Sequence, residues 1–272
     1  IDPCGGREDI GRKLLRAPDL DAFSRDPLRA FRVAQFAARL GFEVDGKLVE
    51  LCRTLPLSSI ASERIEMELR KLWLKPLQPS KGLHAMLDMH LGRTLPEWEL
   101  PSDHGYMEAV DRAAGFREGR EGWDLALMWS VGLHRSSMES AVSLLDRLHI
   151  HSMRRFPVRE RILSSLENWR AFQAPCPPLK LRRLSERCEL RLLACTSEAV
   201  SPGLPFKHLR TAEMLGIDRA PLPQLLQGRD LQRLGYTGIA IGDCLRQIRE
   251  LQIEGRLNSR EDALDYLHEG NG

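Results

Sequence analysis

Four arginines and a glutamine fall on one face of a helix that the sequence predicts from Pro27 to Leu40, or just before it: Arg25, Arg29, Arg32, Gln35 and Arg39. Like charges on one stripe repel each other, so they do not stabilise an isolated helix. The repulsion is relieved when the face binds an anion, a row of carboxylates or a nucleotide. The alternative interpretation is an ordinary solvated helix face.

Asp26 and Arg29 are three residues apart, which aims a carboxylate and a guanidinium in the same direction. Together they present a hydrogen-bond acceptor beside a donor. Adenine and cytosine carry an exocyclic amine next to a ring-nitrogen acceptor, whereas uracil and guanine carry a carbonyl and an N–H there. The pair would therefore select A and C. The competing interpretation makes Asp26 a helix N-cap before Pro27, which contributes ~1 kcal/mol.

Two further clusters of basic residues could contact RNA phosphates, because phosphate binding requires charge rather than sequence-specific geometry. Only seven of the 40 basic residues are lysines, and arginine suits phosphates and base edges better than lysine. A high-GC genome explains the same excess. No aromatic residues interleave with these clusters to suggest stacking on a single strand. The candidate RNA contacts are Arg154, Arg155, Lys180, Arg182, Arg183, Arg246 and Arg249.

The elements that must position these residues are helices, since aromatic residues make up only 6% and Leu, Ala, Arg and Glu recur at helical spacing. Leu28, Phe31, Ala34 and Ala38 mark the apolar side of the first strong helix, and Gly41 ends it. Other helices are expected near 45–54, 62–74, 80–89, 106–115, 121–133, 137–149, 157–171, 180–197, 206–215 and 242–254, and after a capping box of Ser259 and Asp262.

The first twenty residues differ from the rest, because Pro3, Gly5, Gly6 and Gly11 interrupt them. Lys13 to Ala17 is predicted to be the last strand of a preceding sheet domain. The chain does not begin with Met and starts in the middle of a motif, so we expect it to be a fragment.

Composition excludes several classes of protein. The net charge of +2 does not by itself imply nucleic acid, and no stretch is long and apolar enough to span a membrane. The six cysteines form no CxxC pair, and no secretory segment opens the chain. These features favour a reducing cytoplasm and disfavour a cysteine-ligated zinc site.

Consecutive motifs of the chain resemble those of the bacterial class II tRNA nucleotidyltransferase and poly(A) polymerase family. They are Ile1-Asp2-Pro3-x-Gly5-Gly6-x-x-Asp9, Arg25-Asp26-Pro27-Leu28-Arg29-x-x-Arg32, Phe36-Ala37-Ala38-Arg39-Leu40-Gly41-Phe42 and Ser62-Glu63-Arg64-Ile65-x-x-Glu68-Leu69. A weaker resemblance covers residues 225–268, from Gly228-Arg229-Asp230-Leu231 onwards.

The resemblance implies the all-α neck, body and tail of a seahorse-shaped enzyme, after a short remnant of an α/β head. The implied division is 1–24 for the connection to the head, 25–79 for the neck, 80–200 for the body and 201–272 for the RNA-binding tail. The family's template for CTP and ATP corresponds to Asp26 and Arg29, with Arg32 and Arg39 as further nucleotide-binding residues. Arg25 replaces the usual glutamate, and Gln35 replaces an arginine.

The family's head, which carries the carboxylates for two metal ions, has no counterpart in these residues. The chain alone should therefore hold no catalytic or metal-binding residue, whereas the parent enzyme needs Mg with ATP and CTP as substrates. The expected function is selection of nucleotides and binding of tRNA in an enzyme that adds C, A or both to the tRNA 3′ end. A portion of a bacterial poly(A) polymerase and a stand-alone RNA-binding module remain alternatives.

Related enzymes can carry a metal-dependent HD phosphohydrolase-like region, and His104 with Gly132-Leu133-His134-Arg135 resembles a degenerate version of it. Arg135 stands where a metal-binding Asp belongs, and an arginine there would repel the cation. We therefore expect a helical scaffold in the middle of the chain, with His134 as a core histidine.

Overall fold

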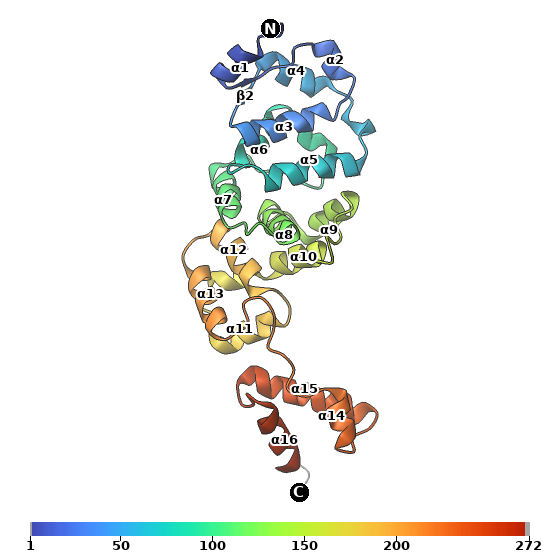
Figure 1. Ribbon diagram of the computed structural model, residues 1–272, viewed down its shortest axis with the longest axis vertical. Coiled ribbons are helices and arrows are strands. Elements are labelled where there is room, and N and C mark those ends of the chain that lie inside the picture. The colour runs from blue at the N-terminus through green and yellow to red at the C-terminus, as the bar shows by residue number, and fades with distance from the viewer. Residues whose placement is uncertain (1, 270–272) are drawn as a thin grey trace. The chain divides into compact units, whose positions relative to one another are not determined.

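A computed structural model of the chain describes residues 2–269, which are mostly helical, with two short strands and three short 3₁₀ helices. The strands are β1 (Leu14–Leu15) and β2 (Glu43–Val44), and the 3₁₀ helices are η1 (Leu57–Ser59), η2 (Leu91–Thr94) and η3 (Trp169–Gln173). The α-helices, labelled in Figure 1, are α1 (Gly6–Arg12), α2 (Leu20–Ser24), α3 (Arg29–Leu40), α4 (Gly46–Thr54), α5 (Ser62–Leu74), α6 (Ser80–Asp88), α7 (His104–Gly115), α8 (Glu121–Gly132), α9 (Met138–Arg147), α10 (Val158–Asn168), α11 (Pro178–Ser185), α12 (Leu190–Val200), α13 (Leu204–Met214), α14 (Gly228–Arg233), α15 (Ile239–Glu254) and α16 (Arg260–Glu269). The all-α prediction is confirmed.

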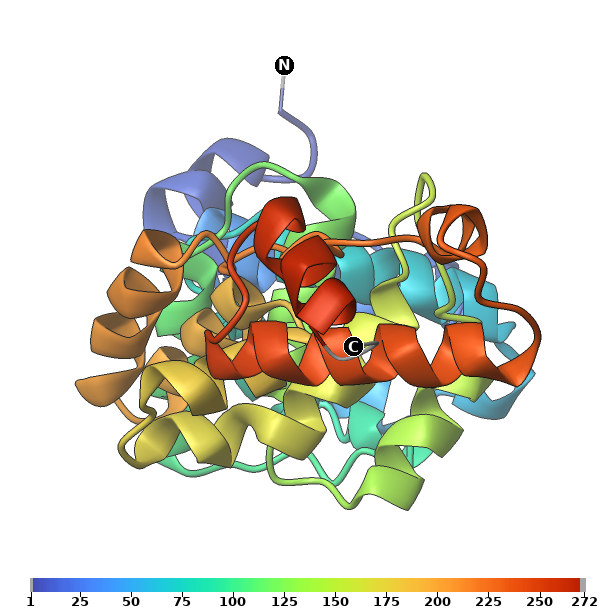
Figure 2. The ribbon, with the colours of Figure 1, turned by 90° about the horizontal axis from the view of Figure 1, so that it is seen from below.

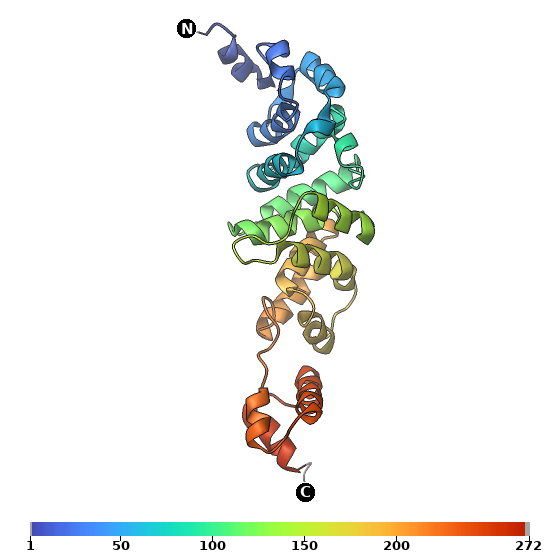
Figure 3. The same cartoon turned by 90° about the vertical axis from the view of Figure 1, so that its right-hand side faces the viewer.

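The described residues divide into two compact units. The first comprises residues 1–173 and 192–206, and the second comprises 174–191 and 207–272. In the first unit, successive helices from α3 to α10 lie in layers, as Figure 3 shows. Among the residues described, no helix combines the length and apolar character that crossing a membrane requires.

The first unit begins with a small αβ arrangement. The predicted strand at 13–17 is present as β1, but its partner is β2 of the same chain rather than a preceding sheet. The two strands run parallel, with Leu14 opposite Glu43 and Leu15 opposite Val44. This pairing fixes the start of the chain to the segment that follows α3.

The apolar side of helix α3 is buried, as predicted. Leu28, Phe31, Ala34 and Ala38 are all buried, and Gly41 ends the helix with φ 68°. Gln35, which was expected on the arginine face, is only 3% exposed. Its position lies at the edge of the stripe, where packing against the neighbouring helices covers it.

Helices α3 and α6 approach each other closely at Gly82. A Cβ at this position would lie 2.7 Å from the carbonyl oxygen of Ala34 and 2.8 Å from Cδ1 of Leu72 on α5. Only glycine therefore fits between the three helices. The contact determines how deeply α3 sits in the unit.

The middle of the first unit contains a cluster of three tryptophans, Trp73, Trp98 and Trp129, with ring centroids 5.3–5.8 Å apart. Trp129 and the other indole of α8, Trp123, are each 1% exposed and so belong to the core. Offset and edge-to-face ring contacts of this kind add to the free energy gained from burial.

The second unit has its own apolar core, formed mainly by α14, α15 and α16. Figure 2 shows α16 lying against the long helix α15. The predicted capping box is confirmed, because Ser259 Oγ accepts from the Asp262 N–H at 3.0 Å and Asp262 Oδ2 accepts from the Ser259 N–H at 3.1 Å. Five of the six cysteines are buried as free thiols.

The prediction of one helix over 180–197 is wrong, because the chain forms α11 and α12 with a turn at 186–189 between them. The N–H groups of Arg187 and Cys188 both bond back to the carbonyl of Leu184. Beyond the turn, the chain passes from the second unit into the first at residue 192. The bonds to Leu184 close α11 in a tight turn, so that helix does not continue into α12.

The close approach at Gly82 makes a first testable prediction. Replacing Gly82 with Ala gains helix propensity, about 1 kcal/mol, but overpacks the contact at a typical cost of about 1–3 kcal/mol. We expect Gly82→Ala to lower the free energy of unfolding by about 1–2 kcal/mol. Gly11→Ala on α1, where nothing lies within 4 Å of the added Cβ, is the matched control and should be neutral or stabilising. Denaturant unfolding measures both, and equal stability of the two variants would contradict the packing argument.

Candidate functional site

Asp26 lies in the turn between α2 and α3. Its Oδ1 accepts a hydrogen bond from the Leu28 N–H at 3.3 Å, and its carbonyl accepts from the Arg29 N–H at 3.0 Å. The carboxylate therefore satisfies the N–H of the residue just before α3, in an Asx-type turn that leads into the helix. This bond uses one oxygen and leaves the other directed elsewhere.

Arg64, at the start of α5, binds the same carboxylate. Its Nη2 donates to Oδ2 of Asp26 at 3.1 Å and to Oδ1 at 3.3 Å. The Asp26 side chain is 33% exposed and that of Arg64 is 48% exposed, so the pair faces solvent in part. An ion pair at this depth contributes little to stability, but it restricts where the carboxylate points.

Arg29 opens α3 one turn further on, and its guanidinium bonds to the chain rather than to Asp26. Its Nη1 donates to the carbonyl of Ala22 at 2.6 Å, and the N–H of Ala22 donates to Oδ1 of Asp19 at 2.9 Å. Asp19 thereby caps α2. The predicted template residues thus lie on adjacent turns, each oriented by a different intrachain partner.

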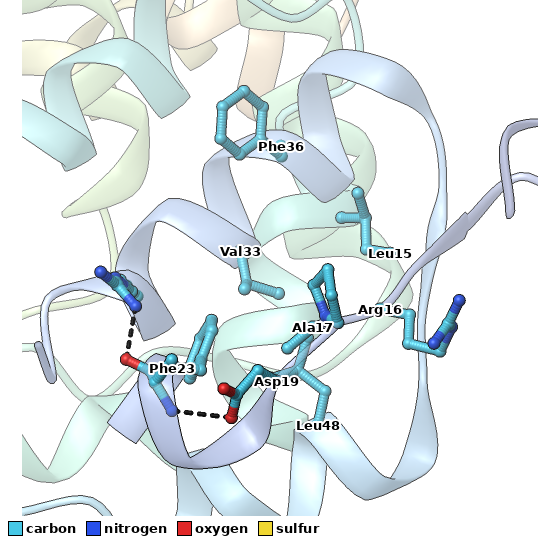
Figure 4. Close-up of a pocket in the computed structure, with 11 residues that line it drawn as sticks. Leu15, Arg16, Ala17, Asp19, Phe23, Val33, Phe36 and Leu48 are labelled. Carbon is cyan, nitrogen blue, oxygen red and sulfur yellow. Dashed lines mark hydrogen bonds between the residues drawn. The ribbon is translucent and has the colours of Figure 1, made fainter. Parts of the chain in front are cut away.

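A pocket of about 420 Å³ adjoins Arg29 (Figure 4). Its walls are mostly apolar, formed by side chains such as Phe23, Val33, Phe36 and Leu48. Asp19, Arg16 and Arg29 supply its polar edge. A mostly apolar cavity with a few polar groups at its rim is typical of small-molecule sites.

The first motif of the chain fixes the N-terminal edge of this pocket. Asp2 accepts the N–H groups of Gly6 and Arg7 at 3.0 and 2.9 Å, and these bonds hold the pKa of its carboxyl below the ordinary value. Arg16 pairs with Asp9 at 2.9 Å and also donates to the carbonyl of Cys4. These contacts explain why this motif carries two aspartates.

Two more of the predicted nucleotide-binding residues are available on the surface. Arg32 and Arg39 are exposed on α3, and within residues 2–269 neither has an ion-pair partner. Both stand clear of the buried side of the helix. They therefore retain their full capacity to bind an anion.

The predicted RNA contacts in the second unit are largely engaged with the chain itself. Arg183 of α11 pairs with Glu250 of α15 at 3.3 Å, and Arg249 of α15 binds Glu186 through two nitrogens. Arg182 lies across the end of α15 at Gly255, whose left-handed φ of 78° and lack of a Cβ make room for the guanidinium. These arginines hold α11 and α15 together.

The other candidates differ in their surroundings. Lys180 lies on α11, and Arg246 pairs with Asp243 one turn before it on α15. Arg154 and Arg155 occupy a surface turn between α9 and α10 in the first unit. The structure therefore separates basic residues that tie helices together from those that face outward.

The positions that resemble a phosphohydrolase site hold no arrangement of metal ligands. Arg135 donates to both carboxylate oxygens of Asp103, and this contact lowers the pKa of Asp103. His134 is buried, which lowers its pKa, and its Nδ1 lies 2.7 Å from the carbonyl of Val131. His104 is exposed and pairs with Glu108. Across residues 2–269, no three His, Cys, Asp or Glu side chains group to hold a metal ion.

Arg64 is the residue that sequence reasoning missed. It belongs to the quoted motif Ser62-Glu63-Arg64, but nothing in its spacing relates it to Asp26, 38 residues earlier. The available signal was an arginine within a motif that had no assigned role. Only the packing of α5 beside the start of α3 brings the two side chains together.

No family model matches the chain, but individual proteins do. It is 28% identical to a multifunctional CCA protein of Alkalilimnicola ehrlichii over 86% of this chain and 54% of that protein. It is 27% identical to a CCA-adding enzyme of Bacillus velezensis over 98% of this chain and 67% of the relative. A stretch of 99 residues is 45% identical to a CC-adding tRNA nucleotidyltransferase of Shouchella clausii, over 35% of this chain and 26% of that protein. The chain thus spans about half the length of the first relative.

Solved structures share the fold. A CCA-adding enzyme in complex with CTP superposes with a TM-score of 0.70 at 19% identity, over 99% of this chain and 66% of that one. The Thermotoga maritima CCA-adding enzyme complexed with tRNA gives a TM-score of 0.60 at 21% identity, over 100% of this chain and 68% of that one. Over nearly its whole length the chain is thus similar in sequence to bacterial CCA-adding enzymes, and it shares the fold of their solved structures.

Proposed function

We propose that this chain selects the incoming nucleotide and binds tRNA in an enzyme that adds C, A or both to the tRNA 3′ end. The observation that carries the proposal is the placement of Asp26 and Arg29 three residues apart at the start of α3, where Arg29 lines the 420 Å³ pocket. A carboxylate and a guanidinium on adjacent turns form an acceptor and a donor that match the amine and ring nitrogen of adenine or cytosine.

The intrachain bonds of the two residues leave room for a base. A carboxylate can accept about four hydrogen bonds and a guanidinium can donate five. Asp26 accepts from Leu28 and Arg64, and Arg29 donates to Ala22 through Nη1 alone. The remaining lone pairs and N–H groups are available to a nucleobase, while the existing bonds keep both side chains from rotating away.

Arg32 and Arg39 continue the same helix and supply positive charge without intrachain partners among the described residues. We assign them to the phosphates of the nucleotide or to the RNA end. We also retain Arg154, Arg155, Lys180, Arg182, Arg183, Arg246 and Arg249 as candidate tRNA contacts, with those of α11 and α15 acting while they also hold their helices together.

The relatives described above are named for adding CC or CCA, which favours this proposal over a poly(A) polymerase. A stand-alone RNA-binding module would bind RNA but would not discriminate among nucleotides. Nucleotide selectivity therefore separates the two interpretations. We place the enzyme in the cytoplasm, where its proposed substrates are found.

The complete enzyme is expected to require magnesium, with ATP and CTP as substrates. When bound, magnesium neutralises charge on the transferring phosphates. The residues described here contain no group of three or more ligand side chains that fits such an ion, so we assign no residue of this chain to it.

Asp26 and Arg29 are tested together in the complete enzyme. We expect Asp26→Ala and Arg29→Ala each to reduce discrimination of CTP and ATP against UTP and GTP about tenfold or more, with Arg29→Ala costing more, because a hydrogen bond to a charged group contributes about 1.5–3 kcal/mol. Steady-state kcat/KM for the four nucleotides measures this. Asp26→Asn is the control for the cap, since its amide oxygen can still accept from Leu28. If Asp26→Asn and Asp26→Ala both keep full selectivity, Asp26 acts only as a helix cap.

Arg64 should act on selectivity through Asp26. We expect Arg64→Ala to reduce the same selectivity ratio by a smaller factor, about three- to tenfold, because the carboxylate remains but is no longer held. Stability should change by no more than about 1 kcal/mol, since the ion pair is half exposed. Arg64→Lys keeps the charge and should restore part of the loss. Selectivity identical to wild type in Arg64→Ala would refute this role.

Binding of tRNA should depend strongly on salt. We expect the affinity for tRNA to fall as salt rises. The logarithm of the association constant should fall linearly with log[salt], with a slope of about −0.9 for each phosphate contacted in a duplex. Fluorescence anisotropy across a salt series measures the slope. A flat response would show that binding, if any, does not use phosphates.

A further inference from the structure

A tight turn of unusual sequence connects α9 to α10. Met153 and Phe156 exchange two backbone hydrogen bonds, of 2.9 and 2.8 Å, around the two residues Arg154 and Arg155. Both arginines have positive φ, 48° and 70°. Positive φ at both central residues is the signature of a type I′ turn.

Arginine is a poor choice for such a turn. Type I′ turns favour Asn-Gly because a Cβ is strained at positive φ, and two adjacent strained residues persist only where the surrounding structure enforces them. Backbone strain of this kind is found most often at functional sites. We therefore expect the side chains of these two arginines to have a function that offsets the strain.

The base of the turn is fixed to the core. A Cβ at Gly122 on α8 would lie 3.1 Å from Cβ of Phe156, so the missing side chain of Gly122 lets Phe156 pack directly onto the helix backbone. Met153 packs against the core from the other side of the turn. Arg154, in contrast, is 86% exposed. The turn is an anchored platform that projects its arginines outward.

A groove of about 580 Å³ lies between this turn and α5. Arg154 forms one side of it, and Arg70, Lys71 and Lys75 of α5 form the other. Met67 and Leu74 add apolar surface between the cations. Charges on two sides with apolar surface between them suit a chain that alternates phosphates with sugars.

The acidic groups around this groove are mostly engaged. Glu66 and Glu68 are buried beneath it and bind Arg70 and Lys71. The carboxylate of Asp124 accepts hydrogen bonds from the N–H groups of Glu118 and Gly119, at 2.7 and 3.0 Å, in the loop just before α8.

Three cations in or near the groove form no hydrogen bond to a carboxylate among the described residues. Glu121 is 3.7 Å from Arg154, which is too long for a hydrogen bond. Lys75 and Arg155 have no acidic partner within residues 2–269. A ligand would therefore meet Lys75 without an ion-pair partner on the α5 side, and on the other side Arg154, whose guanidinium is not hydrogen-bonded to Glu121.

We propose that the groove between α5 and the 153–156 turn binds the sugar–phosphate backbone of RNA, and that the strained turn presents Arg154 to the groove, with the exposed Arg155 beside it. This inference rests on the proposed tRNA binding and adds a contact surface separate from the nucleotide-selecting residues. The strain is tolerated because the charge is needed at that place.

The test replaces the turn with its preferred sequence. The double variant Arg154→Asn with Arg155→Gly relieves the strain and removes the charge. We expect its melting temperature to rise by about 2–6 °C, while affinity for tRNA at 0.1 M salt falls about tenfold or more and the salt slope becomes less steep by about 2. A change that stabilises the protein and weakens binding is not expected of residues with a purely structural role.

Two further variants separate strain from charge. Arg154→Gln with Arg155→Gln keeps the strain and removes the charge, so it should weaken binding equally without raising the melting temperature. Arg12→Gln with Lys47→Gln removes two exposed cations elsewhere in the same unit and should leave the affinity within about twofold of wild type.

The outcomes distinguish this inference from the proposed function. If wild-type protein binds tRNA and both turn variants bind it as tightly, the groove is not an RNA site, while the proposed function stands. If the wild type does not bind tRNA, the proposed function itself fails. If the Asn-Gly variant is less stable than wild type, the turn is not strained, and this account of its arginines is wrong.

Discussion

The contact of α3 with α6 at Gly82 is the constraint on which the candidate site depends. Because a glycine lets α6 reach the backbone of α3, the apolar side of α3 is buried deeply and only its opposite side remains accessible. That side carries the arginines. The turn before α3 lies beside the start of α5, where Arg64 meets Asp26. Helix packing thus also sets the geometry of the candidate site.

The excess of arginine has a structural explanation alongside the RNA-binding one. Arg93 donates to the carbonyls of four residues, including Cys52 and Leu55. Arg117 binds three carbonyls, those of Trp73, Pro76 and Ala114. A planar guanidinium with five donors can satisfy several helix-end carbonyls at once, which lysine cannot do. A fold with many short helices has many such ends, so arginine is useful here independently of any nucleic acid.

The arginines therefore form two populations. Those that bridge helices, such as Arg183 and Arg249, neutralise carboxylates and contribute little net field. Those without partners among the described residues, such as Arg32, Arg39 and Arg155, leave positive charge on the surface. Because the chain's net charge is only +2, its attraction for an anion must come from this uneven distribution rather than from bulk charge.

Most of the fold could be predicted from the sequence, because helix signals are local. The boundaries of α5 at residues 62 and 74 agree with the predicted range, and Gly41 and the Ser259 box mark helix ends through short-range hydrogen bonds.

Several features could not be predicted because contacts between residues far apart in the sequence determine them. Gln35 is covered by neighbouring helices, and the Asp26–Arg64 pair joins residues 38 positions apart. The break at 186–189 is instead a local turn, closed by bonds back to Leu184, that the helical spacing of the residues did not indicate. The short helices α1 and α2 depend on side-chain caps from Asp2 and Asp19 that composition alone did not reveal.

The interleaving of the two units has a consequence for how the chain acquires its structure. Residues 192–206 belong to the first unit, although residues 174–191, which precede them, belong to the second. Leu192, Cys195 and Ala199 complete the core of the first unit, and the carbonyl of Ala199 accepts from Arg112 at 2.8 Å. On a ribosome, the first unit therefore cannot close until residue 206 has emerged, by which time part of the second is already exposed. A chain cut after residue 173 would leave the first unit open at its core.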